Sequence, residues 1–123
     1  MNRRRRKKLQ RRLVEAAGWG SHQDVARLLR AGADPNIPDV YGTTPLYRAS
    51  VQNAFVNVRI LLAAGARTDV ESGTGEQGLP LCAAAAWGHE ETVRELLAAG
   101  ADPELREDRG AGHNAREWAV TRP

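Results

Sequence analysis

Apolar residues recur along the chain in three short runs of nearly the same composition: V-A-R-L-L-R-A at residues 25–31, V-R-I-L-L-A-A at 58–64 and V-R-E-L-L-A-A at 93–99. In each run the large aliphatic residues stand three and four positions apart, which is the spacing of one face of an α-helix. Each run ends at a glycine, as is typical of a helix C-terminus. The pattern therefore predicts three short amphipathic helices at regular intervals.

The segments that follow these helices also repeat. They read G-A-D-P-N from Gly32, G-A-R-T-D from Gly65 and G-A-D-P-E from Gly100, so the spacings are 33 and 35 residues. A unit of this length cannot bury its own apolar face and must stack on copies of itself. We therefore expect the function to lie on the surface of a stack, not in a conventional active-site pocket.

A second helix pattern precedes the second and third runs and returns after the third. The letters are D-V-Y-G-T-T-P-L-Y-R-A-S-V-Q-N-A at residues 39–54, T-G-E-Q-G-L-P-L-C-A-A-A-A-W-G-H at 74–89 and G-H-N-A-R-E-W-A at 112–119. Together with G-A-D-P-N they resemble the ankyrin repeat, from about residue 9 to the C-terminus. The resemblance implies an all-α solenoid of about three full helix-turn-helix repeats plus a C-terminal half repeat. The repeats would span about residues 9–38, 39–71, 74–106 and 109–123, after a basic N-terminal tail at 1–8.

Within these repeats the sequence predicts inner helices from near Lys7 and over 45–51, 80–87 and 115–120. Outer helices are expected over 23–31, 55–64 and 90–99. The second loop, 67–78, carries the two extra residues, and its S-G-T-G-E-Q-G stretch has little to hold it. For the core we expect Leu61, Leu62, Leu96 and Leu97, with Trp118 covering the last inner helix.

Two positions depart from the family pattern. The Thr and His of T-P-L-H normally hydrogen-bond around the loop, and here the pairs are Thr44 with Tyr47 and Leu79 with Cys82. The third repeat has therefore lost that bond. Asn53 replaces the glycine between helices, and asparagine tolerates the left-handed backbone that the turn needs.

Charge is distributed unevenly. Residues 1–12 hold eight of the 18 basic residues and no acid, so the remainder has ten basic against fifteen acidic residues, about −5. A basic cluster of this kind can bind nucleic acid or anionic surfaces through phosphates. No aromatic residue is interleaved with it, so stacking on single-stranded bases is not supported. The alternative is a solvated tail.

Nothing in the sequence indicates catalysis. The three histidines, His22, His89 and His113, have no cysteine or carboxylate at a metal-ligand spacing, and no phosphate-binding loop is present. The single cysteine, Cys82, fits a reducing compartment. We therefore expect a non-enzymatic, monomeric, cytoplasmic protein without cofactor or metal, and with no membrane span because no apolar run approaches 20 residues.

The resemblance places the partner-binding surface on the concave face, formed by loop tips and inner helices. Trp19, Gln52 and Trp87 occupy one repeat position, and Val40 and Tyr41 lie on the first loop tip. The predicted set is completed by Arg48, Val51 and Glu76. Exposed tryptophan is enriched at binding hot spots, although each indole can instead lie flat over the helix turn, and Tyr41 can stack on the adjacent loop. The alternative function is a nucleic-acid-associated or regulatory protein that uses the basic tail.

Overall fold

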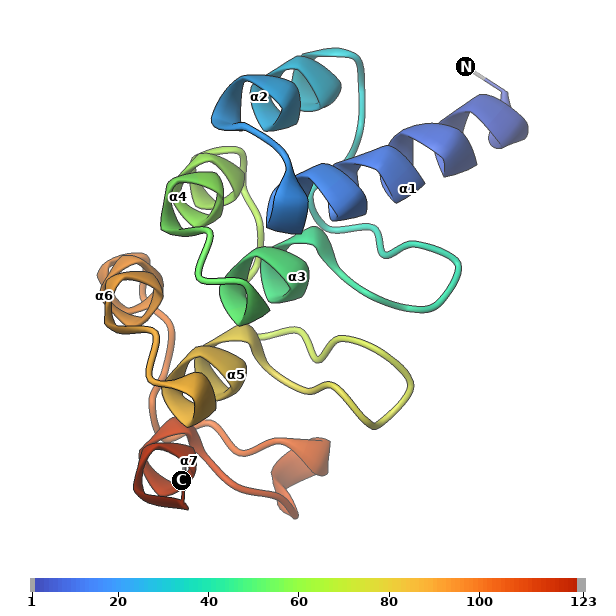
Figure 1. Ribbon diagram of the computed structural model, residues 1–123. Helices are drawn as coiled ribbons and strands as arrows, with labels where there is room; N and C mark the ends of the chain where they lie inside the picture. Colours follow the sequence, from blue (N-terminus) through green and yellow to red (C-terminus); the bar gives the residue numbers. More distant parts are fainter. Residues whose placement is uncertain (1, 122–123) are drawn as a thin grey trace.

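The computed structural model describes residues 2–121, and these form helices and loops throughout (Figure 1). The α-helices are α1 (Arg3–Trp19), α2 (His22–Arg30), α3 (Pro45–Val51), α4 (Phe55–Ala63), α5 (Pro80–Trp87), α6 (Glu90–Ala98) and α7 (Ala115–Thr121), with a short 3-10 helix, η1 (Asp108–Gly110), before α7. The all-α repeat fold expected from the sequence is confirmed.

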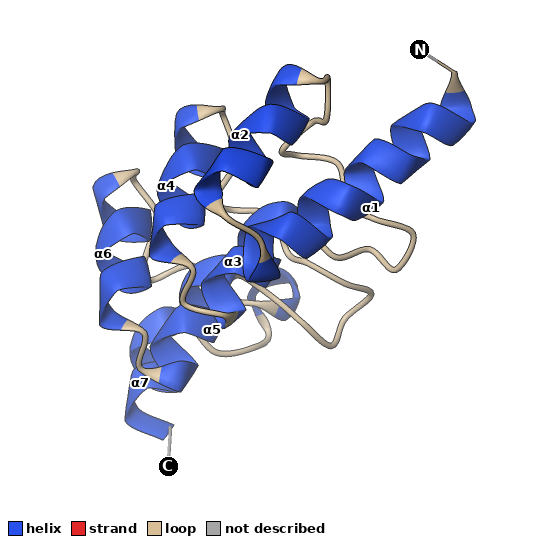
Figure 2. Cartoon of the chain, turned by 45° about the horizontal axis from the view of Figure 1, so that its top comes forward, coloured by secondary structure: helices blue, strands red, loops and turns tan. Residues whose placement is uncertain are grey.

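The helices lie in two rows. Helices α1, α3, α5 and α7 form an inner row and α2, α4 and α6 an outer row, as Figures 1 and 2 show, and each helix packs mainly on its neighbours in the stack. The long loops between repeats project together from the inner row, to one side. The inner row and the projecting loops meet at an angle, and the surface inside this angle is the concave face.

The core lies between the two rows. Leu13, Leu46, Leu61 and Leu96 are at most 2% exposed. Leu97, by contrast, is 42% exposed, so the expectation that it is a core residue was wrong. Leu62 is half-buried and packs against the core. Consecutive residues on a helix point about 100° apart, so only one leucine of each pair can face the inner row.

Helix caps explain where the inner helices begin. The hydroxyl of Thr44 accepts the Tyr47 N–H at 3.2 Å, directly before a proline at the first helical position of α3. Leu79 has no such side chain, as expected, and α5 has no side-chain cap. The Leu79 N–H donates to the Glu107 carboxylate of the next loop at 2.7 Å, as the Thr44 N–H donates to the Ser72 hydroxyl at 2.9 Å in the repeat before.

Helix α1 starts earlier than the sequence suggested. It begins at Arg3, not near Lys7, and Asn2 caps it by accepting the Arg5 N–H at 2.8 Å. The side chain of Gln10 fixes the helix to the first loop, because its amide donates to the carbonyls of Asp34 and Ile37. The basic tail expected at residues 1–8 is therefore helical from Arg3 onward, while Met1 lies outside the described residues.

The second loop is also better held than its sequence suggested. Ser72 and Gly78 form an antiparallel backbone bridge, and Ser72 is fully buried. The Gly73 N–H donates to the Gly42 carbonyl of the first loop at 2.7 Å. The side chain of Gln77 bonds both Ser72 and Thr43. The expectation of an unsupported loop was wrong, because polar side chains inside the loop replace a packed core.

Candidate functional site

Two indoles stand open at the ends of inner helices. Trp19 is the last residue of α1 and Trp87 the last residue of α5, and they are 71% and 68% exposed. Indoles lying flat over the helix turns would be largely covered, and these are not. A tryptophan left this exposed is costly without a role, since its apolar area stays in water.

Between the indoles lies the end of α3. Gln52 is the C-cap of α3, at the same repeat position as the two tryptophans, and it is half-buried. Its side chain and that of Arg48 lie so close over Gly18 that a Cβ there would stand 2.8 Å from Arg48 Cγ. The small residue in α1 thus lets two side chains of α3 lie across the neighbouring helix. Because α1 packs on α3 and α3 on α5, the three equivalent helix ends follow one another along the inner row, and we call them the helix-end column.

Val51 contributes its backbone more than its side chain. It is half-buried, and its carbonyl lies 2.9 Å from the Nε2 of His89, which links the second repeat to the third. His89 thus has a structural role. Asn53, which follows Gln52, adopts the left-handed conformation with φ of 54° and accepts a hydrogen bond from the Thr92 hydroxyl.

The first loop tip presents Val40 and Tyr41, which are 71% and 77% exposed. The tip is a built turn, because the Asp39 carboxylate accepts the N–H groups of Tyr41 and Thr43. An aromatic ring stacked on the adjacent loop would be mostly covered, so the exposure of Tyr41 argues against that alternative. A rigid backbone under exposed apolar side chains lowers the entropic cost of binding.

Glu76 occupies the second loop tip. Its carboxylate accepts the N–H and the hydroxyl of Thr74, and these hydrogen bonds lower the pKa of Glu76 below its usual value. The carboxylate is therefore charged at neutral pH and held in one orientation, with its side chain exposed.

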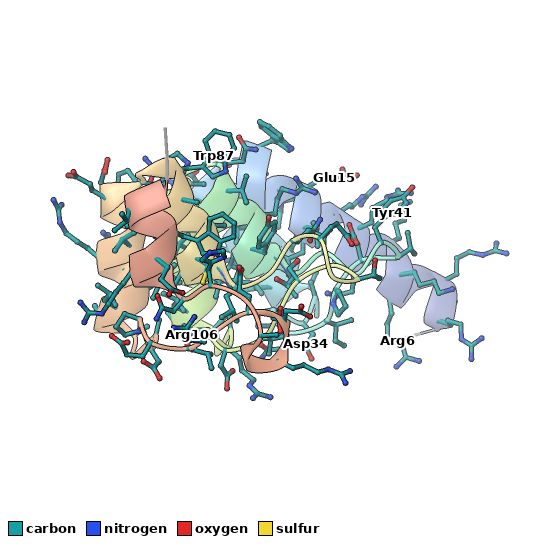
Figure 3. The ribbon with its side chains drawn as sticks, turned by 90° about the horizontal axis from the view of Figure 1, so that it is seen from below. Arg6, Glu15, Asp34, Tyr41, Trp87 and Arg106 are labelled. Atoms are coloured by element: carbon teal, nitrogen blue, oxygen red, sulfur yellow. The ribbon has the colours of Figure 1, made fainter. Side chains whose placement is uncertain are left out.

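The predicted residues thus fall into two groups, the helix-end column and the loop tips. Figure 3 shows Trp87 and Tyr41 on the same side of the molecule, with Glu15 between them, and Asp34 and Arg106 on the opposite side. Glu15 was missed by sequence reasoning, although it stands 33 residues before Arg48 and so occupies the same repeat position. It adds an exposed carboxylate to the concave face, 4.0 Å from Arg11.

The basic residues of α1 form a second surface feature. Arg3, Arg4, Arg5, Arg6, Lys7 and Lys8 are all exposed. Within the described chain none of these six lies in an ion pair, since the pairs involve other arginines. As Figure 1 shows, these first turns of α1 project past the first loop. The tail is therefore a helical arm of unneutralised positive charge.

Chemistry at Cys82 is suppressed by its surroundings. Burial, followed by the nearby Glu107 carboxylate, raises the pKa of the Cys82 thiol to about 12. The thiol is consequently neutral at physiological pH and a poor nucleophile. Among residues 2–121 no three His, Cys, Asp or Glu side chains are grouped so that they could hold a metal ion. Over the same residues, no helix has the length and hydrophobicity needed to cross a membrane.

Comparison with known proteins agrees with this architecture. A family model described as ankyrin repeats (3 copies) matches residues 13–107. The chain is 36% identical over 98 residues to palmitoyltransferase Hip14 of Drosophila melanogaster, covering 80% of this chain and 15% of the relative. It is 41% identical over 87 residues to human neurogenic locus notch homolog protein 4, covering 71% of this chain and 4% of the relative. With human ankyrin repeat and SOCS box protein 16 the identity is 36% over 98 residues, covering 80% of this chain and 21% of the relative. The chain thus spans about a fifth or less of the length of these relatives.

Proposed function

Since this chain belongs to the ankyrin repeat family, whose fold is in general a non-enzymatic protein-interaction module, we propose that it binds a partner protein through its concave face. The observation that carries the proposal is the pair of exposed indoles, Trp19 and Trp87, in one column with Gln52. We further propose that the chain acts as a monomer in the cytoplasm, where a lone thiol stays reduced.

The chemistry of the surface favours a folded protein as the ligand. Interface cores are enriched in tryptophan, tyrosine and arginine and surrounded by polar residues. Here Trp19, Trp87 and Tyr41 supply the aromatic centre, with Arg48 beside the column and the Glu76 carboxylate at the loop tip. Truncation of one indole that a partner buries is expected to weaken binding by about 2 kcal/mol or more.

Affinity capture followed by mass spectrometry tests the proposal. The wild-type chain is compared with a Trp19→Ala, Trp87→Ala double variant and with Val56→Ala. Val56 is a matched control, because it is an exposed apolar residue, 38% accessible, on the outer helix α4. A partner retained by wild type and Val56→Ala but lost by the double variant supports the concave face. Equal retention by all three would refute it.

The basic arm supports a second candidate, a nucleic-acid-associated function. Six consecutive basic side chains are exposed at the start of a helix. They lie at the positive end of the helix dipole, and the first turn contains no acidic residue. Like charges at i and i+4, such as Arg3 and Lys7, destabilise the helix in isolation. Phosphates would relieve both effects. Deletion of residues 1–8 and a salt titration separate the candidates, because phosphate binding falls steeply with salt while binding through Trp87 does not.

A further inference from the structure

A groove of about 480 Å³ lies at the end of the outer row, where α6 has no following neighbour within residues 2–121. Its lining residues come mainly from α5, α6 and α7, the helices at the C-terminal end of the stack in Figure 1. Its lining is mainly aliphatic and contains Leu81, Ala85, Val93, Leu97, Ala115 and Ala119. It shares no residue with the helix-end column or the loop tips of the concave face.

Repeat register shows what this groove lacks. Val25 in α2, Val58 in α4 and Val93 in α6 occupy the same repeat position. Val25 and Val58 are fully buried, whereas Val93 is only half-buried. Helix α4 packs beside α2 and helix α6 beside α4, but no helix of the described residues follows α6. The groove is thus the site that an outer helix fills in the two preceding repeats.

The charge at the rim repeats in the same way. Arg59 of α4 pairs with Glu95 of the next outer helix at 2.7 Å. Arg94 of α6 stands at the register position of Arg59. Among the described residues, its one ion pair is with Glu90 of its own helix, at 3.6 Å, and both side chains are more than 70% exposed. A helix bound in the groove with an acidic residue at the repeat position of Glu95 would therefore place that carboxylate beside Arg94.

We propose that this groove binds an amphipathic helix of a partner protein. The helix carries aliphatic residues at i, i+3 and i+4, as the outer helices of this chain do, and a carboxylate that pairs with Arg94. The wall formed by α7 offers less apolar surface, because Arg116 occupies the repeat position of Leu46 and Leu81. The Arg116 side chain pairs with Glu104. The docked helix therefore rests chiefly on α5 and α6. This surface is independent of the concave face, so either proposal can fail alone.

The chain itself provides the probe. A capped synthetic peptide with the sequence of residues 88–101 contains α6, with its aliphatic positions and the carboxylate of Glu95. It is titrated into the full, isotope-labelled protein and followed by backbone amide resonances. Because so short a helix is marginal in water, we expect weak binding, with a dissociation constant on the order of 0.1–1 mM. The amide resonances of Val93, Leu97 and Ala119 should shift saturably.

Two variants sharpen the test. Leu97→Asp removes an exposed apolar contact, and we expect about tenfold weaker binding, with unchanged circular dichroism as the folding control. A peptide with Glu95→Lys should bind about two- to fivefold more weakly, and Arg94→Glu in the protein should restore the loss. Val56→Ala, on helix α4 outside the groove, should leave the affinity unchanged.

Three results would overturn the proposal. The first is no saturable shift at these residues up to several millimolar peptide, and the second is a shift that persists in Leu97→Asp. The third is sedimentation in which the wild-type chain dimerises and Leu97→Asp does not, because the groove would then be occupied by a second copy of the chain.

Discussion

Adjacent leucines of α6 offer a direct test of how the two helix rows pack. Leu96 is fully buried, whereas Leu97 is 42% exposed. Leu96→Ala removes three buried carbon atoms and leaves a cavity, so we expect a loss of about 2–5 kcal/mol in the free energy of unfolding. Leu97→Ala removes the same atoms from a position already half in water, and we expect less than about 1.5 kcal/mol from the area bookkeeping alone.

The difference is large against the whole stability of such a domain, which is on the order of 5–15 kcal/mol. Urea denaturation followed by circular dichroism at 222 nm measures both variants, and an unchanged slope shows that the same surface unfolds. Equal losses, or a larger loss for Leu97→Ala, would mean that α6 is rotated relative to the inner row and would refute this description of the core.

Further predictions concern the loops and the thiol. Glu107→Ala should lower the free energy of unfolding by about 1–3 kcal/mol, because the Leu79 N–H and the Trp118 indole N–H lose this charged acceptor. A thermal midpoint equal to that of the wild type would contradict this. In hydrogen exchange the amides of Ser72 and Gly78 should be protected relative to that of Gly75, which forms no backbone hydrogen bond in the loop, and uniform fast exchange would show that the bridge is open. Cys82 should resist alkylation at pH 8 in the folded protein and react rapidly in denaturant, since its pKa of about 12 keeps the thiol protonated; rapid labelling of the native chain would be the contrary result.

The repeat fold could be predicted from sequence because its signal recurs. Helix spacing, the glycine after each outer helix and the proline at the start of inner helices appear in register, so local errors do not change the architecture. Asn53 was likewise predictable, because few residues other than glycine adopt its positive φ.

What the sequence did not reveal depends on contacts between distant residues. The long second loop resembles a flexible linker in composition, yet Gln77 bonds Thr43 and Ser72 accepts the Thr44 N–H, which joins the loop to the first one. The first turns of α1 look like a repelling charge run, yet they continue a helix that Gln10 bonds to the first loop. The choice between Leu96 and Leu97 required the helix rotation, which two adjacent apolar letters do not define.

The candidate site was accessible to sequence reasoning only as a set of positions. Register placed Trp19 and Trp87 at equivalent helix ends, and the structure shows both exposed. The same register also places Glu15 at the repeat position of Arg48, although sequence reasoning overlooked it. Whether these residues contact a partner stays a prediction.

The hydrogen bonds that join successive loops have a consequence for how this surface can change over time. Asn36 bonds the carbonyl of Gly65 and the N–H of Arg67, and Glu107 bonds the N–H of Leu79, so in these links a side chain of one loop grips the main chain of another. Main-chain groups are present whatever side chain the residue carries. Substitutions at the exposed loop tips therefore leave these hydrogen bonds intact. New partner specificities can arise there by mutation while the fold stays stable.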